Sequence, residues 1–452
     1  MRSTDMYLDG DNIYQHAIVP LQLEGTDSEG VETVIWKNET PNSAFMCRPQ
    51  ALIRGKEDRT LVKYDLSYAE REHAALEASP TTVVSSRYPD TSYNIAHTII
   101  DSMKDLKMKK VASGAGGAPC LLCDSKKNDW VDKETVESGF PINRNAETAD
   151  QMWKKIVKDK EEGKKTKDRK GQTQEPITAS NQEHICVTHS LINVTNWYLK
   201  LLARCRANVK MWKEEQYGSR GDRIRKAKAE LQEMIEMQTA MRIDMCNRAG
   251  EKTGGSTKGN DGRDFFFVKH VAKIRKIIQE AVPDQFQQGL VEVHRNIGVI
   301  LRIMSCTRKV NVIEYRGLMK ETNLLIIREF PWAAINWTLH GCLSHSADLM
   351  ELHDGRGLGD LSEEALESNN KWIRNFACFR ARKTSPEAQM SDVMARLLER
   401  SDPYQQELKA KYHLKKQRRR PVLASQNKSD VEMEIDQLVE DLLLVEDLLK
   451  DE

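Results

Sequence analysis

Residues 361–383 read Leu-Ser-Glu-Glu-Ala-Leu-Glu-Ser-Asn-Asn-Lys-Trp-Ile-Arg-Asn-Phe-Ala-Cys-Phe-Arg-Ala-Arg-Lys, and no other stretch constrains the interpretation of this sequence as strongly. Its periodicity predicts a helix. On that helix Ala365, Trp372, Phe376 and Phe379 fall on one stripe, and an apolar stripe of this kind is expected to be buried.

Glu367 lies away from that stripe, and Lys371 and Arg374 follow it at positions i+4 and i+7. A carboxylate beside cations suits a site that holds a metal ion next to phosphate groups. The other interpretation is a solvated Glu–Lys pair on an amphipathic helix. The later part of the segment adds three cations: Arg380, Arg382 and Lys383.

The chain of 452 residues can hold two or three domains, each with its own core. Its hydrophobic content of 39% and charged content of 30% are typical of a soluble globular protein with exposed helices. Because the sequence has neither a run of 18 apolar residues nor an apolar signal segment, we expect no membrane partner and no secretion. The nine cysteines are mostly scattered, which favours a reducing compartment.

Charge is distributed unevenly along the chain. Residues 430–452 hold ten acids and one lysine, a net charge of −9, so residues 1–429 carry +10 within the total of +1. Residues 409–420 contain seven Lys or Arg and no acid, which predicts a nuclear-import or DNA-backbone segment and a nuclear location. A basic body with an acidic tail is typical of a nucleic-acid binder.

Local patterns predict an α+β protein. Residues 14–23 and 31–36 are β-leaning and flank a turn signal, whereas most of the chain after residue 184 has helical periodicity. Residues 253–263 form a glycine-rich loop in this interpretation. The predicted regions are residues 1–110 (strand-rich), 111–183 (a cysteine loop and a charged insertion), 184–360 (helical), 361–404 (the helix with Glu367 and a basic face), 405–427 (basic) and 428–452 (acidic and amphipathic).

Two cysteines and two histidines could together provide the four ligands of a zinc site. Cys120 and Cys123 form a CxxC pair, and His340 and His345 can complete a tetrahedral shell. Side chains five residues apart diverge by about 140° on a straight helix, so one histidine must lie where a helix ends or bends. Cys342, between the histidines, is a possible decoy. Two buried thiols would also explain the CxxC pair.

Three acids are candidates for a second metal site. Asp5 precedes the first β-leaning run, Asp101 ends the apolar pair Ile99-Ile100, and Glu367 lies on the helix described above. Two strand-end aspartates and a helical glutamate can hold two Mg²⁺ ions about 4 Å apart, as in an RNase H-like fold. Taken singly, Asp5 can be a terminal residue and Asp101 a helix N-cap.

The order of these motifs closely resembles that of Transib-type transposases, transposon relatives of the catalytic core of the V(D)J recombination-activating recombinase. The resemblance runs from about residue 3 to residue 403. The motifs that carry it, besides the acids and the zinc ligands, include Ile35-Trp36-Lys37-Asn38, Cys47-Arg48-Pro49, His97-Thr98, Gly259-Asn260-Asp261-Gly262, Pro331-Trp332, Asn370-Lys371, Arg382-Lys383 and Ser401-Asp402-Pro403.

The resemblance implies an RNase H-like mixed sheet interrupted by a large, mainly helical insertion. It also implies that Asp5, Asp101 and Glu367 are a catalytic triad for two Mg²⁺ or Mn²⁺ ions, and that one structural Zn²⁺ binds the two cysteines and two histidines. The implied activity is nicking and hairpin formation at terminal inverted repeats of double-stranded DNA, followed by strand transfer into target DNA, by a homodimer. The expected backbone contacts are Asn260, Arg263, Lys371, Arg374, Arg380, Arg382 and Lys383.

The sequence departs from the family pattern at both aspartates. A glycine usually follows the first, but Met6 follows Asp5, and Ser102 and Met103 replace the glycine and lysine expected after Asp101. Only four residues precede Asp5, so the usual N-terminal end-binding region is expected to be missing. If the register slips, Asp9 or Asp11 takes the place of Asp5.

Two other functions are compatible with the sequence. A decayed or domesticated transposase would bind DNA without cutting it, which would fit the departures around the aspartates. A helical adaptor would explain the acidic tail and the charged helices, but it gives no reason for the ordered acids and metal ligands.

Overall fold

The computed structural model describes residues 13–26, 30–38, 40–41, 43–54, 59–79, 81–84, 92–95, 120, 122–123, 125–142, 149–163, 175, 185–213, 218–246, 257, 259–266, 270–362, 364–402, 404–406 and 408. No helix in these ranges combines the length and the apolar character that a membrane crossing requires. The described residues fall into two compact units. The first takes its residues from 1–113, 148–184 and 360–424, and the second from 114–147, 185–359 and 425–452.

All the strands among the described residues belong to the first unit. One sheet is the antiparallel pair β1 (Ile13–Ile18) and β4 (Arg48–Arg54). The other has the order β3-β2-β6-β5, also antiparallel. Its strands are β2 (Gln22–Thr26), β3 (Glu32–Lys37), β5 (Thr81–Val84) and β6 (Ser92–Ile95).

The strands confirm the predicted α+β class, and β2 and β3, on either side of the predicted turn signal, pair antiparallel. The first run is divided, because β1 ends at Ile18 and β2 begins at Gln22, on either side of Pro20. Proline has no N–H for a strand ladder, so a break there is expected. The expected mixed sheet is not seen among the described strands, since all their pairings are antiparallel.

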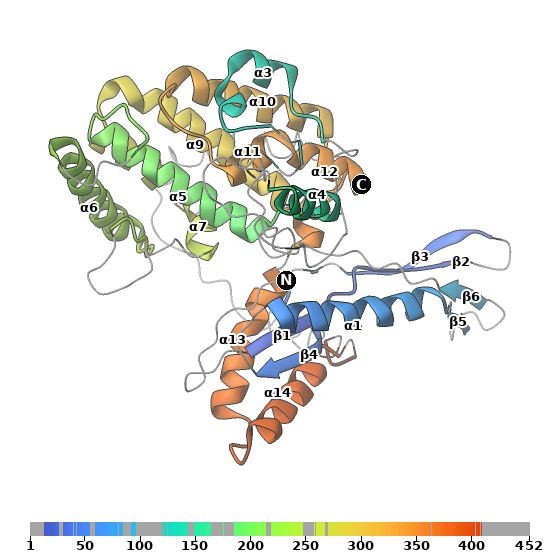
Figure 1. Cartoon of the computed structure of the whole chain (residues 1–452). Helices are drawn as coiled ribbons and strands as arrows, with labels where there is room; N and C mark the ends of the chain where they lie inside the picture. The colour runs from blue at the N-terminus through green and yellow to red at the C-terminus, as the bar shows by residue number, and fades with distance from the viewer. Residues whose placement is uncertain are drawn as a thin grey trace. The chain divides into compact units, whose positions relative to one another are not determined.

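The first unit also contains α1 (Arg59–Glu77), α4 (Ala149–Glu161), α13 (Glu364–Phe379) and α14 (Pro386–Arg400). Side chains alternate along β1, so Ile13 and Tyr14 face opposite sides. Ile13 packs with Ile373 of α13 and Leu397 of α14, whereas Tyr14 packs with Val62 of α1. The β1–β4 pair therefore lies between α1 and the α13–α14 hairpin (Figure 1).

A buried polar cluster joins β1 to α1. The Tyr14 hydroxyl donates to Asp65 Oδ2 at 2.7 Å, and His16 Nδ1 lies 3.0 Å from the same oxygen. Burial alone would raise the pKa of Asp65, but the hydrogen bonds from His16 and Tyr14 lower it overall. The ionised carboxylate is therefore the form that this packing favours.

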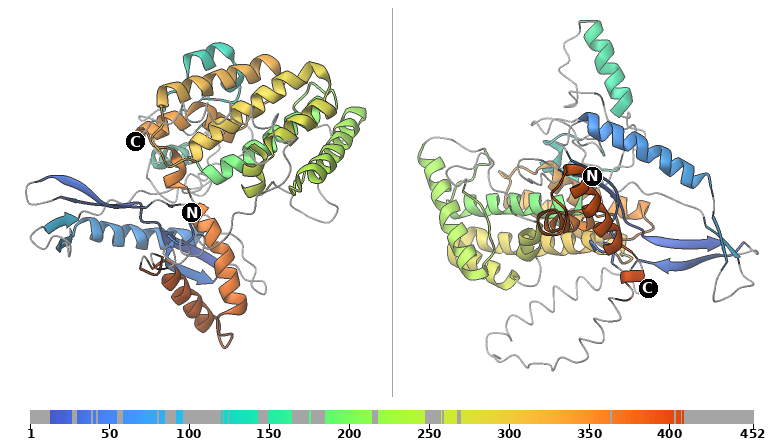
Figure 2. Two further views of the ribbon diagram at one scale, coloured as in Figure 1. Left: turned by 180° about the vertical axis from the view of Figure 1, so that it is seen from behind. Right: turned by 90° about the horizontal axis from the view of Figure 1, so that it is seen from below.

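The second unit is helical. Its elements are the 3₁₀ turn η1 (Asp129–Val131), α3 (Lys133–Ser138), α5 (Val187–Arg206), α6 (Ser219–Thr239), α7 (Gly259–Phe266), α8 (Val271–Ala281), α9 (Asp284–Ser305), α10 (Val312–Glu329), α11 (Trp337–Ser344) and α12 (Ser346–Leu352). One large apolar core runs through them. Seen from behind, α9 and α10 pack side by side (Figure 2).

The prediction of a loop over residues 253–263 was wrong for its last five residues, which begin α7. The glycines serve close packing there. A Cβ added at Gly262 would lie 3.0 Å from both Leu191 O and Thr195 Oγ1 of α5, and one at Gly259 would lie 3.2 Å from Thr188 Cγ2. Only glycine lets the two helices approach this closely.

The predicted apolar stripe on residues 361–383 was right in part. Ala365 is fully buried, and Trp372 and Phe376 are partly buried against the core of the first unit. Phe379 is 78% exposed at the end of α13. The fully buried line instead continues from Ala365 through Ile373 to Ala377, and Phe379 lies about 200° round the helix from Ala377.

Candidate metal centre and basic helix

In the second unit, a short loop and the helix pair α11–α12 carry the predicted zinc ligands. The loop with Cys120 and Cys123 closes on itself, because the Cys120 N–H donates to the carbonyl of Ser125 at 2.7 Å. His340 lies within α11, and His345 lies in the break between α11 and α12. The predicted helix break between the histidines is therefore confirmed.

The four ligand atoms converge. One donor atom from each of the four residues lies within 4.8 Å of those of the other three. Cys120 Sγ is 3.4 Å from His345 Nε2, and Cys123 Sγ is 3.5 Å from His340 Nε2. The two Nε2 atoms are 3.2 Å apart. Residues 217 positions apart in the sequence thus meet in one cluster.

These distances fit a tetrahedral zinc ion. With Zn–S bonds of about 2.3 Å and Zn–N bonds of about 2.0 Å, tetrahedral geometry separates ligand atoms by roughly 3.3–3.8 Å. The three distances given above lie in or next to that range. Two thiolates and two imidazoles are also the donor set that a structural zinc site uses, with no position left open for a reacting molecule.

Burial and mutual contacts shift the pKa values of the two thiols in opposite directions. The hydrogen bond with Cys120 holds the pKa of Cys123 well below its ordinary value, and contacts with His340 and His345 act in the same direction. Burial raises the pKa of Cys120 well above its ordinary value. Burial also lowers the pKa of His340, which keeps its imidazole neutral. A cation requires the deprotonated thiols and neutral imidazoles, so zinc uptake would release protons.

Cys342 does not belong to this cluster. It is 1% exposed in the apolar core, and burial raises the pKa of its thiol to about 12. A protonated, buried cysteine of this kind is a packing residue. This agrees with its interpretation as a decoy.

Several residues around the ligands were not anticipated from the sequence. Trp130 stacks on the His340 ring with centroids 4.4 Å apart and an angle of 9°, and Phe140 meets the same ring edge-on at 4.8 Å. Ser344 Oγ lies 3.2 Å from His340 Nδ1, and Ser125 Oγ lies 2.9 Å from Cys123 Sγ. Only the short separation of Trp130 and Phe140 from the CxxC pair could have pointed to them.

Of the acidic candidates for the second metal site, the structure describes Glu367 alone. Asp5 and Asp101, together with the alternatives Asp9 and Asp11, lie outside the described residues. Glu367 is half-buried in the first turn of α13, where the helix dipole stabilises a negative charge. Ser362 supports the beginning of this helix, because its Oγ accepts a hydrogen bond from the Glu364 N–H at 3.2 Å.

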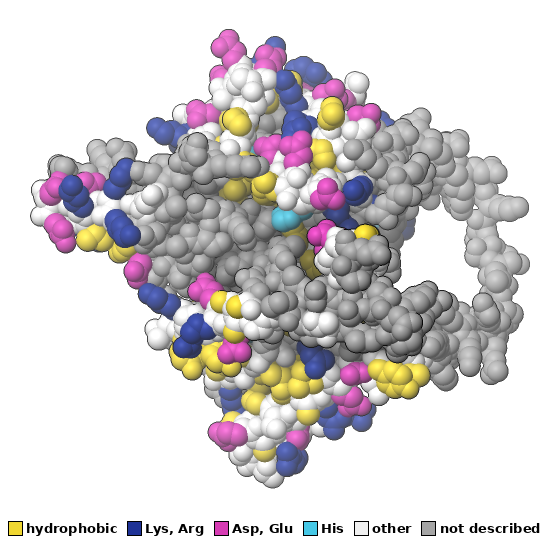
Figure 3. Space-filling model, turned by 90° about the vertical axis from the view of Figure 1, so that its right-hand side faces the viewer, with side chains coloured by type: hydrophobic (Ala, Val, Ile, Leu, Met, Phe, Trp, Pro, Cys, Tyr) yellow, Lys and Arg dark blue, Asp and Glu magenta, His cyan; other side chains and the backbone are white. Residues whose placement is uncertain are grey.

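Positive charge is concentrated in the second half of α13 and in the residues that follow this helix. On the face drawn in Figure 3, acidic and cationic side chains are interspersed with apolar ones. From residue 369 to residue 385 the chain has no acid. Four of the five cations predicted to contact DNA there are exposed and make no ion pair among the described residues: Lys371, Arg374, Arg380 and Lys383.

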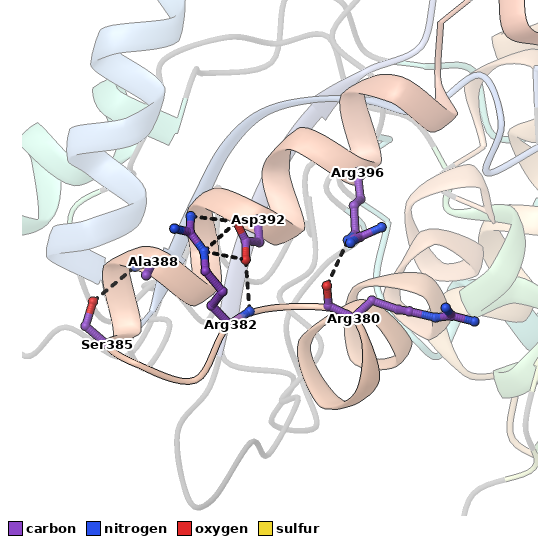
Figure 4. Close-up of polar contacts among 6 residues, drawn as sticks. All are labelled: Arg380, Arg382, Ser385, Ala388, Asp392 and Arg396. Carbon is purple, nitrogen blue, oxygen red and sulfur yellow. Dashed lines mark hydrogen bonds and ion pairs between the residues drawn. The ribbon is translucent and has the colours of Figure 1, made fainter.

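The fifth cation, Arg382, is already engaged. Its Nε and Nη2 donate to the carboxylate of Asp392 at 2.8–3.2 Å, and its backbone N–H donates to the same group at 2.9 Å. Arg396 donates to the carbonyl of Arg380 at 2.9 Å (Figure 4). These contacts join the end of α13 to α14, while the Arg380 side chain points away from them.

The other two predicted DNA contacts lie on α7 in the second unit. Asn260 is exposed near the start of that helix, and Arg263 is half-buried one turn later. Both therefore occupy fixed helical positions and not a loop. Whether they contact DNA stays a prediction.

The chain matches a known family model over part of its length. Residues 9–118 match the family model described as the Recombination-activation protein 1 (RAG1) RNase H domain. No curated protein matches the chain. The family match confirms the relation to the recombination-activating recombinase and Transib-type transposases that the sequence motifs predict, and it ends two residues before Cys120.

Proposed function

We propose that this chain is the catalytic core of a DNA recombinase or transposase, which nicks double-stranded DNA at inverted repeats, forms hairpins and transfers strands. Residues 9–118 match the family model of the RAG1 RNase H domain, which supports this proposal. The observation that carries the proposal further is the convergence of Cys120 and Cys123 with His340 and His345, in the order that the related transposases have.

Zinc would have a structural role in this protein. Bound to the four ligands, it would fix the cysteine loop to α11 and α12, far along the chain. The polar shell and the stacked Trp130 suit a closed site. Cleavage chemistry therefore has to come from the acidic residues.

Glu367 would hold catalytic Mg²⁺ or Mn²⁺ together with Asp101 and an aspartate near the start of the chain. Carboxylate oxygens are the ligands these ions prefer, and the ions would activate the attacking oxygen and stabilise the leaving oxygen of a phosphodiester. The protein's own contribution is to position the carboxylates and to hold the DNA backbone with the cations of α13.

Two facts bear on the first aspartate. The family match begins at residue 9 and so includes Asp9 and Asp11 but not Asp5, and glycine follows Asp9, as the resemblance expects. Ile13 also packs against α13 at Ile373, about 9 Å along the helix from Glu367. An extended chain can carry Asp9 about 14 Å from Ile13, but Asp5 about 28 Å. Because fewer residues separate it from Ile13, Asp9 is favoured over Asp5 as the first acid of the triad.

A nicking assay tests the proposed activity. Supercoiled plasmid and a pre-nicked duplex with a free 3′-hydroxyl are incubated with the protein and Mg²⁺ or Mn²⁺, and relaxed plasmid and hairpin are measured. We expect Glu367→Gln to lower both by about 100-fold or more, because a metal ligand is lost. Glu364→Gln, in the same helical turn, is the matched control and should retain activity.

The same assay separates the candidates for the first acid. Asp9→Asn is expected to abolish nicking, whereas Asp5→Asn and Asp11→Asn are expected to leave it within about twofold of the unaltered protein. Loss of activity in Asp5→Asn alone would show that Asp5, and not Asp9, is the first acid of the triad. Activity that survives Glu367→Gln would remove the proposed catalytic site.

The second candidate is a DNA-binding protein without cleavage activity, which the residues Ser102 and Met103 after Asp101 favour. It predicts salt-sensitive DNA binding with no nicking under either metal. The proposed homodimer and nuclear location have their own tests. Sedimentation equilibrium measures the oligomer, and neutral substitutions of the basic residues within 409–420 should move a fluorescent fusion out of the nucleus.

A further inference from the structure

The ligand cluster contains a side chain that is not a ligand. Ser125 Oγ lies 2.9 Å from Cys123 Sγ and 3.5 Å from His340 Nε2. Trp130 Nε1 donates a hydrogen bond to the same oxygen at 2.7 Å. One hydroxyl group is thus in contact with two predicted ligands and with the indole that stacks on one of them.

The direction of these hydrogen bonds follows from the chemistry of the groups. An indole N–H can only donate, so Ser125 Oγ accepts from Trp130 and keeps its own hydrogen for another partner. His340 Nε2 has a single lone pair, which the ion would use. Cys123 Sγ has further lone pairs and is closer. The Ser125 hydroxyl therefore donates to Cys123 Sγ.

Trp130 is held firmly enough to orient the serine. It is fully buried, in the short turn η1. That turn is fixed by two contacts of aspartates, since the Lys126 N–H donates to Asp129 Oδ2 at 2.7 Å and Asp132 accepts from the Thr135 N–H at 2.9 Å. The same indole both stacks on His340 and donates to Ser125.

We propose that Ser125 and Trp130 are positioning residues of the zinc site, which set the Cys123 sulfur and the His340 ring in place before the ion binds. This inference rests on the proposed zinc site and names two residues that would raise its affinity for zinc. A donor to a ligating thiolate reduces the charge on its sulfur and fixes its direction, and such outer contacts are worth about 10–100-fold in metal affinity.

The test is a set of metal titrations of the full chain. Ser125→Ala removes the donor to Cys123, and we expect about 10–100-fold weaker Zn²⁺ binding in competition with a chromogenic chelator. Ser125→Thr keeps the hydroxyl and should restore most of the affinity. Ser138→Ala is the matched control, because that exposed hydroxyl donates only to the Thr135 carbonyl at 2.8 Å.

A double-mutant cycle tests whether the two residues act as one chain of hydrogen bonds. Trp130→Phe keeps a ring over His340 but loses the N–H, and we expect roughly tenfold weaker binding. If Trp130 acts through Ser125, the double variant should bind no more than about twofold more weakly than Ser125→Ala. If the double variant instead loses zinc affinity by the product of the two single losses, Trp130 does not act through Ser125.

Cobalt absorption gives a readout independent of activity and of overall stability. In Ser125→Ala the sulfur-to-cobalt charge-transfer band should shift, while circular dichroism of the metal-free protein stays unchanged. An affinity and a band that match those of the unaltered protein would overturn the positioning role. An unaltered protein that takes up no metal would instead overturn the zinc site itself.

Discussion

At the scale of single residues, glycines show how packing overrides local pattern. Gly262 and Gly317 are both helical, but they meet different surroundings. A Cβ at Gly262 would lie 3.0 Å from Leu191 O of α5, whereas one at Gly317 in α10 would have no heavy atom within 4 Å beyond the backbone of its own helix and its two chain neighbours. The glycine at 262 therefore permits a helix contact, and the one at 317 only weakens its helix.

Alanine substitutions should separate these two roles. Gly262→Ala is expected to destabilise the protein by about 1–3 kcal/mol, because the backbone carbonyl of Leu191 cannot move aside. Gly317→Ala should stabilise it by up to about 1 kcal/mol through helix propensity. Urea unfolding followed by circular dichroism measures both, and equal effects of the two would contradict the close-packing explanation.

Asp65 provides a prediction on pH. Because its pKa is lowered in the folded state, the ionised carboxylate contributes stability above the ordinary value of 3.8, and this contribution is lost as pH falls through the lower folded value. Asp65→Asn should therefore be destabilised at neutral pH by about 1–3 kcal/mol and less so in acid. Tyr14→Phe, which removes one donor, should show a smaller effect of the same sign. A loss for Asp65→Asn that stays constant from neutral pH down to pH 2 would contradict the role of ionisation.

At the scale of elements, residue spacing predicted features that depend on a single helix. It did not predict features that depend on how two elements pack together. The divergence of side chains five residues apart was enough to predict the break that contains His345. The burial of Phe379 could not be judged from its own helix, because strand β1 and helix α14 determine where the core ends. Ser125 has no spacing relation to His340, so only the folded chain reveals their contact.

The α13–α14 hairpin yields a prediction about DNA binding. Arg374→Gln and Arg380→Gln should each reduce the slope of log affinity against log salt by about 0.9, as expected for one phosphate contact. Arg382→Gln should change it less, because Arg382 is bound to Asp392. Fluorescence anisotropy with duplex DNA at several salt concentrations provides the slopes.

The reverse substitution sharpens this prediction. Asp392→Asn releases Arg382, so DNA affinity and its salt slope should both rise, whereas Glu387→Gln on the same helix removes a charge without breaking the Arg382 contact. Equal effects of the two substitutions would show that net charge alone is at work. No change in either would show that this end of α13 does not face DNA.

At the scale of the whole molecule, the two units depend on different interactions. The zinc ligands all belong to the second unit, whereas Glu367, the β1–β4 pair and the Asp65 cluster belong to the first. The sequence predicted that the cysteine pair meets the two late histidines, but it did not predict the residues that surround these ligands, such as Trp130 and Ser125. The two sites should therefore respond separately when zinc is withdrawn.

Chelation should loosen the second unit while the first keeps its structure. At free zinc 100-fold above the dissociation constant, binding contributes about 2.7 kcal/mol, and a strong chelator removes it. Hydrogen exchange should then rise in residues 120–142, α11 and α12, with α13 and α14 unchanged. Cys123→Ser should reproduce this pattern with zinc present, and Cys342→Ala should still bind one ion per chain. Equal loss of protection in both units would mean that they unfold together, so that the zinc supports the catalytic unit as well.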